Sequence, residues 1–308
     1  MNMFGGIDLG GTKIEACLFD PDLKEIARRR VPTPRQSFDE LLDALVAQYE
    51  WLRAEAGTAA LPVGVGIPGL IERATGLSLT SNLPATNRPL HDELSRRLGF
   101  AVPVDNDCKC FALSEANGGA GEGYDTVFGL ILGTGCGAGV CHKGQLVVGL
   151  NGLPGEVGHF GIAMNAAPQV TLPMRQCNCG RYGCYETLVS GPGMTALARS
   201  LKGLDLSPEQ IASGAAAGDA NLAEILTVWA DIVGELLRTI QGTIDPDCIV
   251  LGGGLSRIEG VAELLARQMP GHFIGGMRAP AIVVARYGDS SGVRGAAMLA
   301  ARQPVHSG

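Results

Sequence analysis

Apolar and polar positions alternate in short runs at the start of the chain. The alternation covers residues 4–8 and 14–19, and a third run follows at 25–31. Because successive side chains of a strand point to opposite faces, this pattern predicts a meander of β-hairpins. The same order of strand, glycine-rich turn, strand and strand recurs at 126–149. We interpret this recurrence as an internal duplication of an α/β fold.

Helical periodicity begins after the first meander. Ser37 and Glu40 are typical of a capping box, and apolar residues behind them recur at helical spacing as far as Leu52. Further helices are expected at 89–99, from 110 to 116, at 222–240 and at 293–302. Further strands are expected at 62–67, 101–104, 126–132, 248–251 and 281–285, with a glycine run at 133–139 and a second meander at 140–148.

Composition excludes several classes of protein. Of the 308 residues 46% are hydrophobic and only 18% are charged, so the chain can bury a large core. Its 24 basic and 31 acidic residues give a net charge of −7, which argues against a nucleic-acid partner bound by phosphate neutralisation. We expect no membrane span and no cleaved signal, because no apolar run is long enough. Nine cysteines, an odd number, favour reduced thiols in a cytoplasmic protein over a disulfide framework.

Glycine-rich loops follow predicted strands in each half of the chain. In Asp8-Leu-Gly10-Gly11-Thr12-Lys13, consecutive glycines let backbone N–H groups converge on an anion, and Asp8 offers a carboxylate to a hydrated Mg²⁺. Gly133-Thr134-Gly135-Cys136-Gly137 has the same place in the second meander, and Gly252-Gly253-Gly254 follows a later strand. Each loop taken alone could be a tight turn. Two related loops suggest that both grip one polyphosphate, although the spacing is not that of a Walker A motif.

The segment Asp105-Asn106-Asp107 stands between a predicted strand and a predicted helix. A carboxylate at this place could take the proton from an attacking hydroxyl in phosphoryl transfer. The alternative is helix capping, for which Asn and Asp are well suited, and the two roles are compatible.

Three cysteines are clustered in Cys177-x-Cys179-Gly-x-x-Gly-Cys184-x-Glu186. This spacing favours a tight knuckle around Zn²⁺, with buried thiols or a redox pair as the alternatives. Three sulfurs need a fourth ligand, and His159 in Gly155-Glu156-Val-Gly-His159 is the nearest upstream histidine. Such a set is closed and structural rather than catalytic.

Taken together, these motifs resemble the ROK family of sugar kinases and repressors over essentially the whole chain. The specific part of the resemblance is the Gly155–His159 motif followed by the cysteine knuckle. It implies two ribonuclease-H-like α/β domains of the actin/hexokinase/Hsp70 ATPase fold, with ATP and sugar in the cleft between them. The expected domains are 1–116 plus 292–308, which is the smaller, and 117–291, which carries the zinc knuckle. A homodimer fits the family.

The resemblance also implies roles for individual residues. Asp107 would be the general base for the 6-hydroxyl of the sugar, and Asp8 would lie near the Mg²⁺ of Mg-ATP. His159 would bind zinc through one ring nitrogen and face the sugar with the other. The other residues implied to bind sugar are Gly69, Asn82, Asn106, Glu156 and Glu186. Those implied to bind ATP phosphates or adenosine are Gly10, Gly11, Thr12, Lys13, Gly133, Thr134, Gly135, Gly253 and Gly254.

One position departs from the family pattern. Many relatives have Asn-Asp-Ala-Asn where this chain has Asn106-Asp107-Cys108-Lys109. An ammonium two residues from the predicted base would lower the pKa of Asp107 if it pointed inward. We expect it instead to point outward as a solvated helix residue.

The segment Ser81–Leu90 bears on the choice of sugar. Glucose- and fructose-type relatives often have a Trp near 85 or 86, whereas this chain has Trp only at 51 and 229. The segment is more similar to the Asn-Val-Pro-Ala form of N-acetylglucosamine kinases, so we predict phosphorylation of N-acetyl-D-glucosamine. Two other segments, Gly133–Val140 and Gly288–Ala296, resemble the fructokinase and mannokinase branch, which leaves fructose, mannose and glucose as alternatives.

Two non-enzymatic functions are also compatible with the family. Repressor members carry a helix-turn-helix domain before the first glycine loop, and here only seven residues precede Asp8. A sugar-binding protein without turnover would commonly lack the carboxylate that Asp107 provides. Both features favour a kinase.

Overall fold

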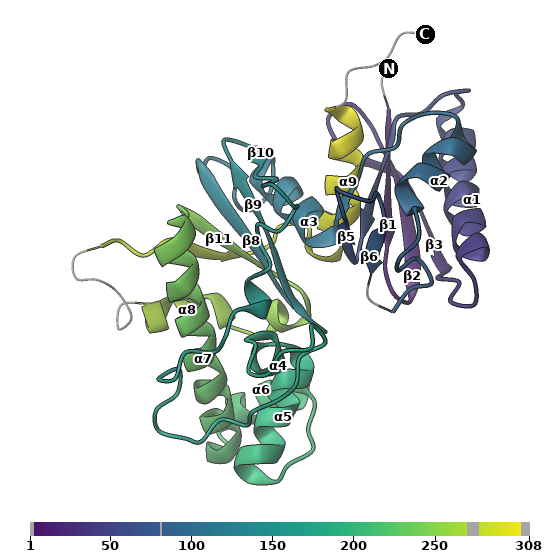
Figure 1. Ribbon diagram of the computed structural model, residues 1–308. Helices are drawn as coiled ribbons and strands as arrows, with labels where there is room; N and C mark the ends of the chain where they lie inside the picture. The colour runs from purple at the N-terminus through teal and green to yellow at the C-terminus, as the bar shows by residue number, and fades with distance from the viewer. Residues whose placement is uncertain (1–2, 81, 270–276, 303–308) are drawn as a thin grey trace. The chain divides into compact units, whose positions relative to one another are not determined.

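The computed structural model describes residues 3–80, 82–269 and 277–302 (Figure 1). The chain splits into two compact units. The first comprises Met1–Asn117, Gln145–Pro154 and Asp289–Gly308, and the second comprises Gly118–Gly144 and Gly155–Gly288. The domain bounds drawn from the sequence stay a prediction.

The first unit is built on a sheet of strand order β3-β2-β1-β4-β7. Its first three strands form the antiparallel meander that the sequence predicts, and β4 and β7 extend the sheet in parallel beside β1. The strands are β1 (Phe4–Leu9), β2 (Lys13–Phe19), β3 (Glu25–Pro32), β4 (Val63–Ile67) and β7 (Val104–Asn106).

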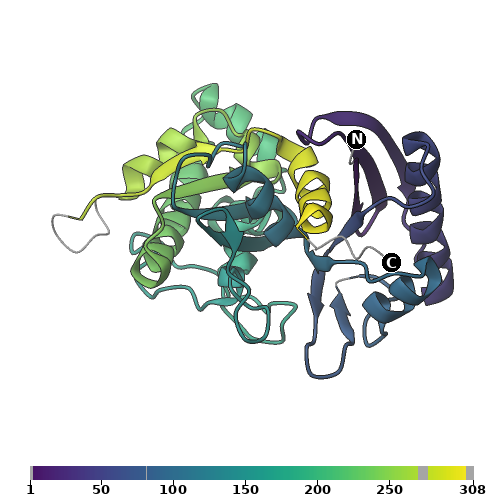
Figure 2. The same cartoon turned by 90° about the horizontal axis from the view of Figure 1, so that it is seen from above.

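Helices cover both faces of this sheet. α1 (Phe38–Ala56) begins where the Ser37 side chain accepts the Glu40 N–H at 3.1 Å, as the predicted cap requires. A Cβ added at Gly5 would meet Leu52 of α1, whereas one added at Gly6 would meet α9 (Ser291–Ala301). Because neighbouring strand residues face opposite sides, α1 and α9 lie on opposite faces (Figure 2).

The backbone of α9 packs directly against the backbone of the sheet. A Cβ at Gly6 would lie 2.0 Å from the Val293 carbonyl oxygen, and one at Gly64 would lie 2.1 Å from that of Ala296. A Cβ at Gly295 would lie 1.8 Å from the Cys110 carbonyl oxygen of α3 (Asp107–Ala116). No side chain fits at these positions, which accounts for part of the high glycine content.

The second unit repeats the topology of the first. Its sheet has the order β10-β9-β8-β11-β12, with β8 and β9 antiparallel and with β11 parallel to both β8 and β12. The strands from the second unit are β8 (Thr126–Leu132), β9 (Cys136–His142), β11 (Cys248–Gly252) and β12 (Ala281–Val284), whereas β10 (Gln145–Leu146) falls within the residues assigned to the first unit. In both sheets an antiparallel meander is followed by parallel strands, so the predicted duplication is confirmed.

Helices make up most of the rest of the second unit. The longest is α7, whose buried Trp229 donates its indole N–H to the Val189 carbonyl at 3.0 Å. The helices are α4 (Glu186–Val189), α5 (Gly191–Lys202), α6 (Pro208–Ala216), α7 (Ala220–Ile244) and α8 (Val261–Gln268), with short 3-10 turns η1 (Val157–His159) and η2 (Gly254–Arg257). A further 3-10 turn, η4 (Gly288–Ser290), spans the point in the chain where the second unit ends.

Several boundaries differ from those that the sequence predicts. The strand β7 ends at Asn106 rather than at 104, and α3 begins at Asp107 rather than at 110, because the Asn106 side chain caps the helix. The strand β9 begins at Cys136, within the glycine run expected as a loop. The hairpin of β5 (Gly69–Ile71) and β6 (Ser78–Thr80) was not predicted, since strands this short carry little periodicity. The helix predicted at 89–99 is α2 (Leu90–Leu98).

Among the described residues, no helix is both long enough and apolar enough to cross a membrane.

Candidate active site and metal cluster

Two carboxylates, those of Asp8 and Asp107, lie near the carboxyl ends of β1 and β7, the two strands that flank β4 in the first unit. The sheet register places Asp8, Gly66 and Asp105 side by side. A Cβ added at Gly66 would lie 3.6 Å from Asp8 Oδ1 and 3.7 Å from Asp107 Cα. On another side of Asp8, a Cβ at Gly292 would lie 3.4 Å from Oδ2. The absence of side chains at both glycines therefore lets Asp8 and Asp107 lie close together.

The start of α3 is fixed by Asn106. Its Oδ1 accepts the backbone N–H groups of Cys108 at 2.9 Å and Lys109 at 3.3 Å, while its Nδ2 donates to the Gly69 carbonyl at 3.1 Å. Asp107 is the first residue of the helix. Capping is thus the role of Asn106, and it sets the backbone from which the Asp107 carboxylate projects.

Gly69 and Asn82 both have unusual backbone conformations. Gly69 has φ of +152°, and a Cβ there would lie 2.0 Å from the Leu79 carbonyl oxygen, so only glycine fits. Asn82 is exposed and left-handed, with φ of +59°, a conformation that Asn tolerates better than most residues. Ser81, the first residue of the segment used to choose the sugar, lies outside the described residues.

The site raises the pKa of Asp8 from its usual 3.8 to about 7. Burial is the main cause, followed by the negative charges of Asp107 and then Glu15, whereas Lys13 acts in the opposite direction. A carboxylate that is costly to ionise gains most from a bound cation. Asp8 could therefore hold a hydrated Mg²⁺, whose preferred ligands are oxygens.

The Lys109 side chain does not point to solvent, so that expectation is wrong. Lys109 is only 3% exposed, and its Nζ lies 3.1 Å from Asp105 Oδ1. The partner carboxylate comes from the end of β7, not from the helix that carries Lys109. A reading of the helix alone misses it.

The loop from Asp8 to Lys13 is the turn between β1 and β2. The Gly10 N–H donates to the Lys13 carbonyl at 2.9 Å, and Thr12 is exposed beside it. A Cβ at Gly11 would meet no atom within 4 Å, so the space next to this turn is open. The Lys13 ammonium lies 3.3 Å from the buried carboxylate of Glu15.

Arg35 is a second cation at this loop that sequence reasoning missed. Its Nε donates to the Gly11 carbonyl at 2.8 Å. The residue follows the proline break after β3, a place where the sequence gives no sign of contact with the first loop.

In the second unit the other two glycine loops are brought together. A Cβ added at Gly133 would lie 3.9 Å from Gly253 Cα and from Gly254 N. Gly253 has φ of +80°, and a Cβ there would lie 2.5 Å from the Leu132 carbonyl oxygen. Thr134 is exposed on the first loop. Such glycine-lined backbone suits close approach of a phosphate group.

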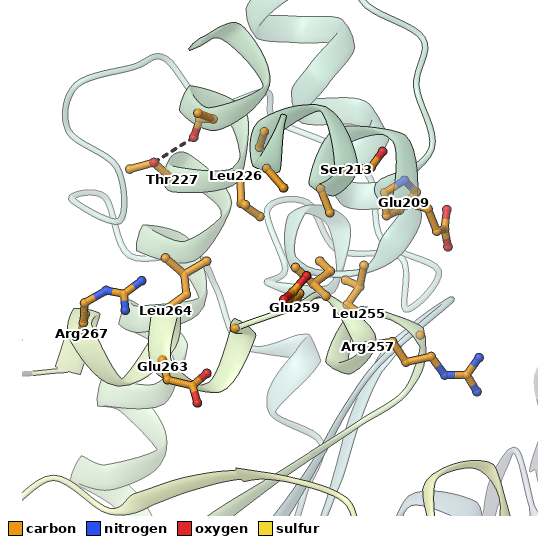
Figure 3. Close-up of a pocket in the computed structure, with 18 residues that line it drawn as sticks. Glu209, Ser213, Leu226, Thr227, Leu255, Arg257, Glu259, Glu263, Leu264 and Arg267 are labelled. Atoms are coloured by element: carbon orange, nitrogen blue, oxygen red, sulfur yellow. Dashed lines mark hydrogen bonds between the residues drawn. The ribbon is translucent and has the colours of Figure 1, made fainter. Parts of the chain in front are cut away.

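A hollow of about 760 Å³ adjoins Gly254 (Figure 3). Its walls come from η2, from α8, from α6 with Ser213, and from α7 with Leu226. Leu255 and Leu264 contribute apolar surface. Sequence reasoning did not find this hollow, because its walls are distant in the chain and carry no motif.

The predicted metal ligands form one cluster. One ligand atom from each of His159, Cys177, Cys179 and Cys184 lies within 4.8 Å of all the others. The Cys179 and Cys184 sulfurs are 3.6 Å apart, and His159 Nδ1 is 3.4 Å from Cys177 Sγ. Tetrahedral Zn²⁺ with Zn–S near 2.3 Å would separate its ligand atoms by roughly 3.8 Å, so the set fits zinc. In the absence of a cation, burial raises the pKa of the Cys177 thiol to about 12, which disfavours the thiolate.

Two glutamates flank the cluster. His159 Nε2, the ring nitrogen not used toward Cys177, lies 3.8 Å from Glu156 Oε2. Glu186 Oε2 accepts the Cys136 N–H at 2.9 Å, and its Oε1 lies 3.8 Å from Cys177 Sγ. Glu186 therefore connects the metal cluster with the loop that contains Gly133 and Gly135.

The chain belongs to the ROK family, whose family model matches residues 4–303. The two duplicated α/β units agree with this, and the predicted fold class is confirmed by solved structures of ROK sugar kinases. One of them is a glucokinase from Streptomyces griseus in complex with glucose and AMPPNP. It is 28% identical, covers 98% of this chain and 100% of its own, and superposes with a TM-score of 0.77.

Among curated relatives, the chain is similar to kinases of 2-acetamido sugars. It is 40% identical to N-acetylgalactosamine kinase AgaK of Shewanella sp. (strain ANA-3), over 96% of each protein. It is 39% identical to N-acetyl-D-glucosamine kinase of Pectobacterium atrosepticum, over 96% of this chain and 98% of the relative.

The raised pKa of Asp8 predicts a stability cost that depends on pH. The folded chain binds an extra proton between the ordinary value of 3.8 and about 7, so its stability relative to the unfolded chain falls as pH rises through this window. Asp8→Asn removes this term. Thermal unfolding without ligands should give the variant a higher Tm than the wild type above about pH 7, with the difference vanishing toward about pH 4.

Asp22→Asn is the control, because Asp22 is exposed in the turn between β2 and β3 of the same unit. Its Tm should follow that of the wild type at every pH. A Tm difference for Asp8→Asn that does not change with pH would contradict the assigned cost.

Proposed function

We propose that the protein is an ATP-dependent kinase that phosphorylates the 6-hydroxyl of N-acetyl-D-glucosamine. The observation that carries this proposal is the convergence of Asp8 and Asp107 around Gly66 in a chain whose relatives are kinases of 2-acetamido sugars. Phosphoryl transfer to an alcohol needs a base at the hydroxyl and neutralisation of the phosphate charge. These two carboxylates can serve the two needs.

Asp107 is the base in this proposal. Its carboxylate accepts the proton of the 6-hydroxyl as the oxygen attacks the γ-phosphorus of Mg-ATP, and the bond from the γ-phosphorus to the β–γ bridging oxygen breaks to release ADP. The Asn106 cap and the start of α3 hold the base in place, so little reorganisation is needed at the moment of transfer. Asp8, with its raised pKa, is stabilised as a carboxylate by the magnesium of the substrate.

The remaining sugar contacts are assigned to two sets of residues. One set belongs to the first unit and comprises Gly69, Asn82 and Asn106. The hydrogen bond from Asn106 Nδ2 to the Gly69 carbonyl holds these two residues together, which supports assigning both to the same ligand. Glu156, His159 and Glu186 belong to the second unit. Hydroxyl recognition by such polar groups discriminates strongly between sugars, because an unmatched buried polar group is costly.

Nucleotide binding is assigned to the glycine loops. Backbone N–H groups of Gly11, Thr12, Thr134 and Gly135, with the Lys13 ammonium, would bind the phosphates of ATP. Gly10 and Gly133, whose N–H groups donate to the Lys13 and Gly135 carbonyls, would let the phosphates approach the two loops closely. The hollow beside Gly253 and Gly254 is large enough for an adenosine, and its apolar wall suits a purine ring.

The four-residue cluster is assigned to a structural Zn²⁺. A metal bound by His159 Nδ1 would fix the imidazole so that Nε2 is available to a sugar hydroxyl beside Glu156, which agrees with the 3.8 Å separation of that pair. The cytoplasm as the compartment, a homodimer, and the lack of nucleic-acid and membrane partners stay predictions.

The choice of sugar is tested by a coupled assay of ADP release with Mg-ATP. We expect kcat/KM for N-acetylglucosamine to exceed that for glucose, mannose, fructose and N-acetylmannosamine at least tenfold, or about 1.4 kcal/mol in transition-state binding. N-acetylgalactosamine belongs in the same panel because of the AgaK relative. A preference for it would keep the 2-acetamido class and change the sugar. A preference for fructose, mannose or glucose would contradict the inference from the Asn82 segment.

The base is tested by Asp107→Ala. The variant should bind sugar nearly as well as the wild type while kcat falls by about 10²–10⁴-fold, the usual contribution of a general base. Equilibrium sugar binding and steady-state kinetics separate the two effects, with Asp22→Asn as the control carboxylate. A kcat close to that of the wild type would exclude Asp107 as the base.

The zinc assignment is tested by Cys179→Ser. We expect loss of bound zinc, a lower Tm and weaker sugar binding together, because the metal would hold His159 next to Glu156. Zinc per chain is measured by atomic spectroscopy, and Cys248→Ser, a buried cysteine of β11 outside the cluster, is the matched control. Unchanged zinc content in Cys179→Ser would rule out the proposed ligand set.

A further inference from the structure

Lys109 is a buried cation that the proposed mechanism does not use. It is the third residue of α3, two positions after the proposed base, and 3% of its surface is exposed. A positive charge in the first turn of a helix is unfavourable, because the exposed N–H groups there already carry positive partial charge. Burial adds a desolvation cost. Both costs imply a partner that compensates for them.

The compensating partner is Asp105. Its Oδ1 accepts a hydrogen bond from the Lys109 ammonium at 3.1 Å and another from the backbone N–H of Asn106 at 2.8 Å. The carboxylate therefore joins the first turn of α3 to the last residue of β7 through a single oxygen. Asn106, held in this way, caps α3 and reaches the Gly69 carbonyl.

The ammonium is also covered from the 145–154 segment of the same unit. A Cβ added at Gly152 would lie 3.3 Å from Lys109 Nζ, and Gly152 is buried with φ of +72°. A short chain stretch leads from Gly152 to Glu156, one of the residues assigned to the sugar. The Lys109 ammonium thus lies next to the start of that stretch. The backbone of Lys109 belongs to the same first turn of α3 as Asp107.

We propose that Lys109 is a positioning residue. Its buried ammonium is paired with Asp105 next to Gly152, and this pair fixes the end of β7 and the first turn of α3, which carry Asn106 and Asp107. The inference rests on the proposed function of Asp107. The ammonium acts through the Asp105 carboxylate, which holds the Asn106 backbone. The lysine of this pair is buried and the Asp105 side chain is 23% exposed. Removing one member leaves the other charge without its partner, whereas removing both restores neutrality.

The test compares Lys109→Met, Asp105→Asn and the double variant. Lys109→Met keeps a long side chain and removes the charge, and we expect kcat to fall at least tenfold while KM for ATP changes less than twofold. In the double variant the amide oxygen introduced by Asp105→Asn can still accept the Asn106 N–H, and no charge is left unpaired. If the ammonium acts only through Asp105, the kcat of the double variant should be no lower than that of the more impaired single variant, because the two residues share one link. The control is Lys202→Met, which removes a lysine paired with Glu224 on the second unit.

Each outcome decides the proposal. A fall in kcat of less than tenfold for Lys109→Met overturns it, even if the Tm is lower, because a merely structural pair would change stability alone. A double variant whose fall in kcat equals the product of the two single falls also overturns it, because the ammonium would then act other than through Asp105. If Lys109→Met does not fold, Asp105→Asn gives the same test with the same tenfold threshold. Asp107→Ala, assayed in parallel, separates the two hypotheses: if it keeps its kcat, the proposed base itself is wrong.

Discussion

The first unit depends on the close approach of backbone to backbone at its glycines. Gly6 and Gly64 let α9 lie directly on β1 and β4, and Gly295 lets α3 lie directly on α9. This spacing brings Gly292 to Asp8 and sets α3 so that Asp107 comes next to Gly66. A methyl group at any of the first three positions would lie about 2 Å from a carbonyl oxygen, so the helices would have to move. The position of both carboxylates is therefore a consequence of packing that excludes side chains.

This arrangement has an electrostatic cost. Packing without side chains removes water from Asp8 and places a second carboxylate beside it, and the raised pKa of Asp8 is the result. Such a site is unfavourable for the free protein and favourable for a bound cation, because the cation removes the repulsion that folding creates. The cost is thus tied to the chemistry proposed for the site, in which a magnesium nucleotide supplies the positive charge.

Local patterns were sufficient to predict much of this molecule. Hydrophobic periodicity predicts the strand meanders and their duplication, capping chemistry predicts the Ser37 cap, and cysteine spacing predicts the cluster of three cysteines with His159. All of these signals depend on near neighbours in the chain. The missed features depend on distant segments. Arg35 reaches the first glycine loop, Lys109 turns inward to a carboxylate of another element, and the hollow beside Gly254 has walls from four elements. The roles assigned to the site residues stay predictions, because they concern ligands.

The two units hold their polar groups by different means that serve the same physical end. In the second unit His159 Nδ1 lies 3.4 Å from Cys177 Sγ, which leaves Nε2 toward Glu156. In the first unit the strand end that carries Asn106 is held by a helix cap and by an ion pair. In both cases a group proposed to meet the sugar is fixed through partners that do not meet it. Orientation before binding reduces the entropy lost when the substrate arrives, and it also explains why charged residues are kept in places where burial alone would disfavour them.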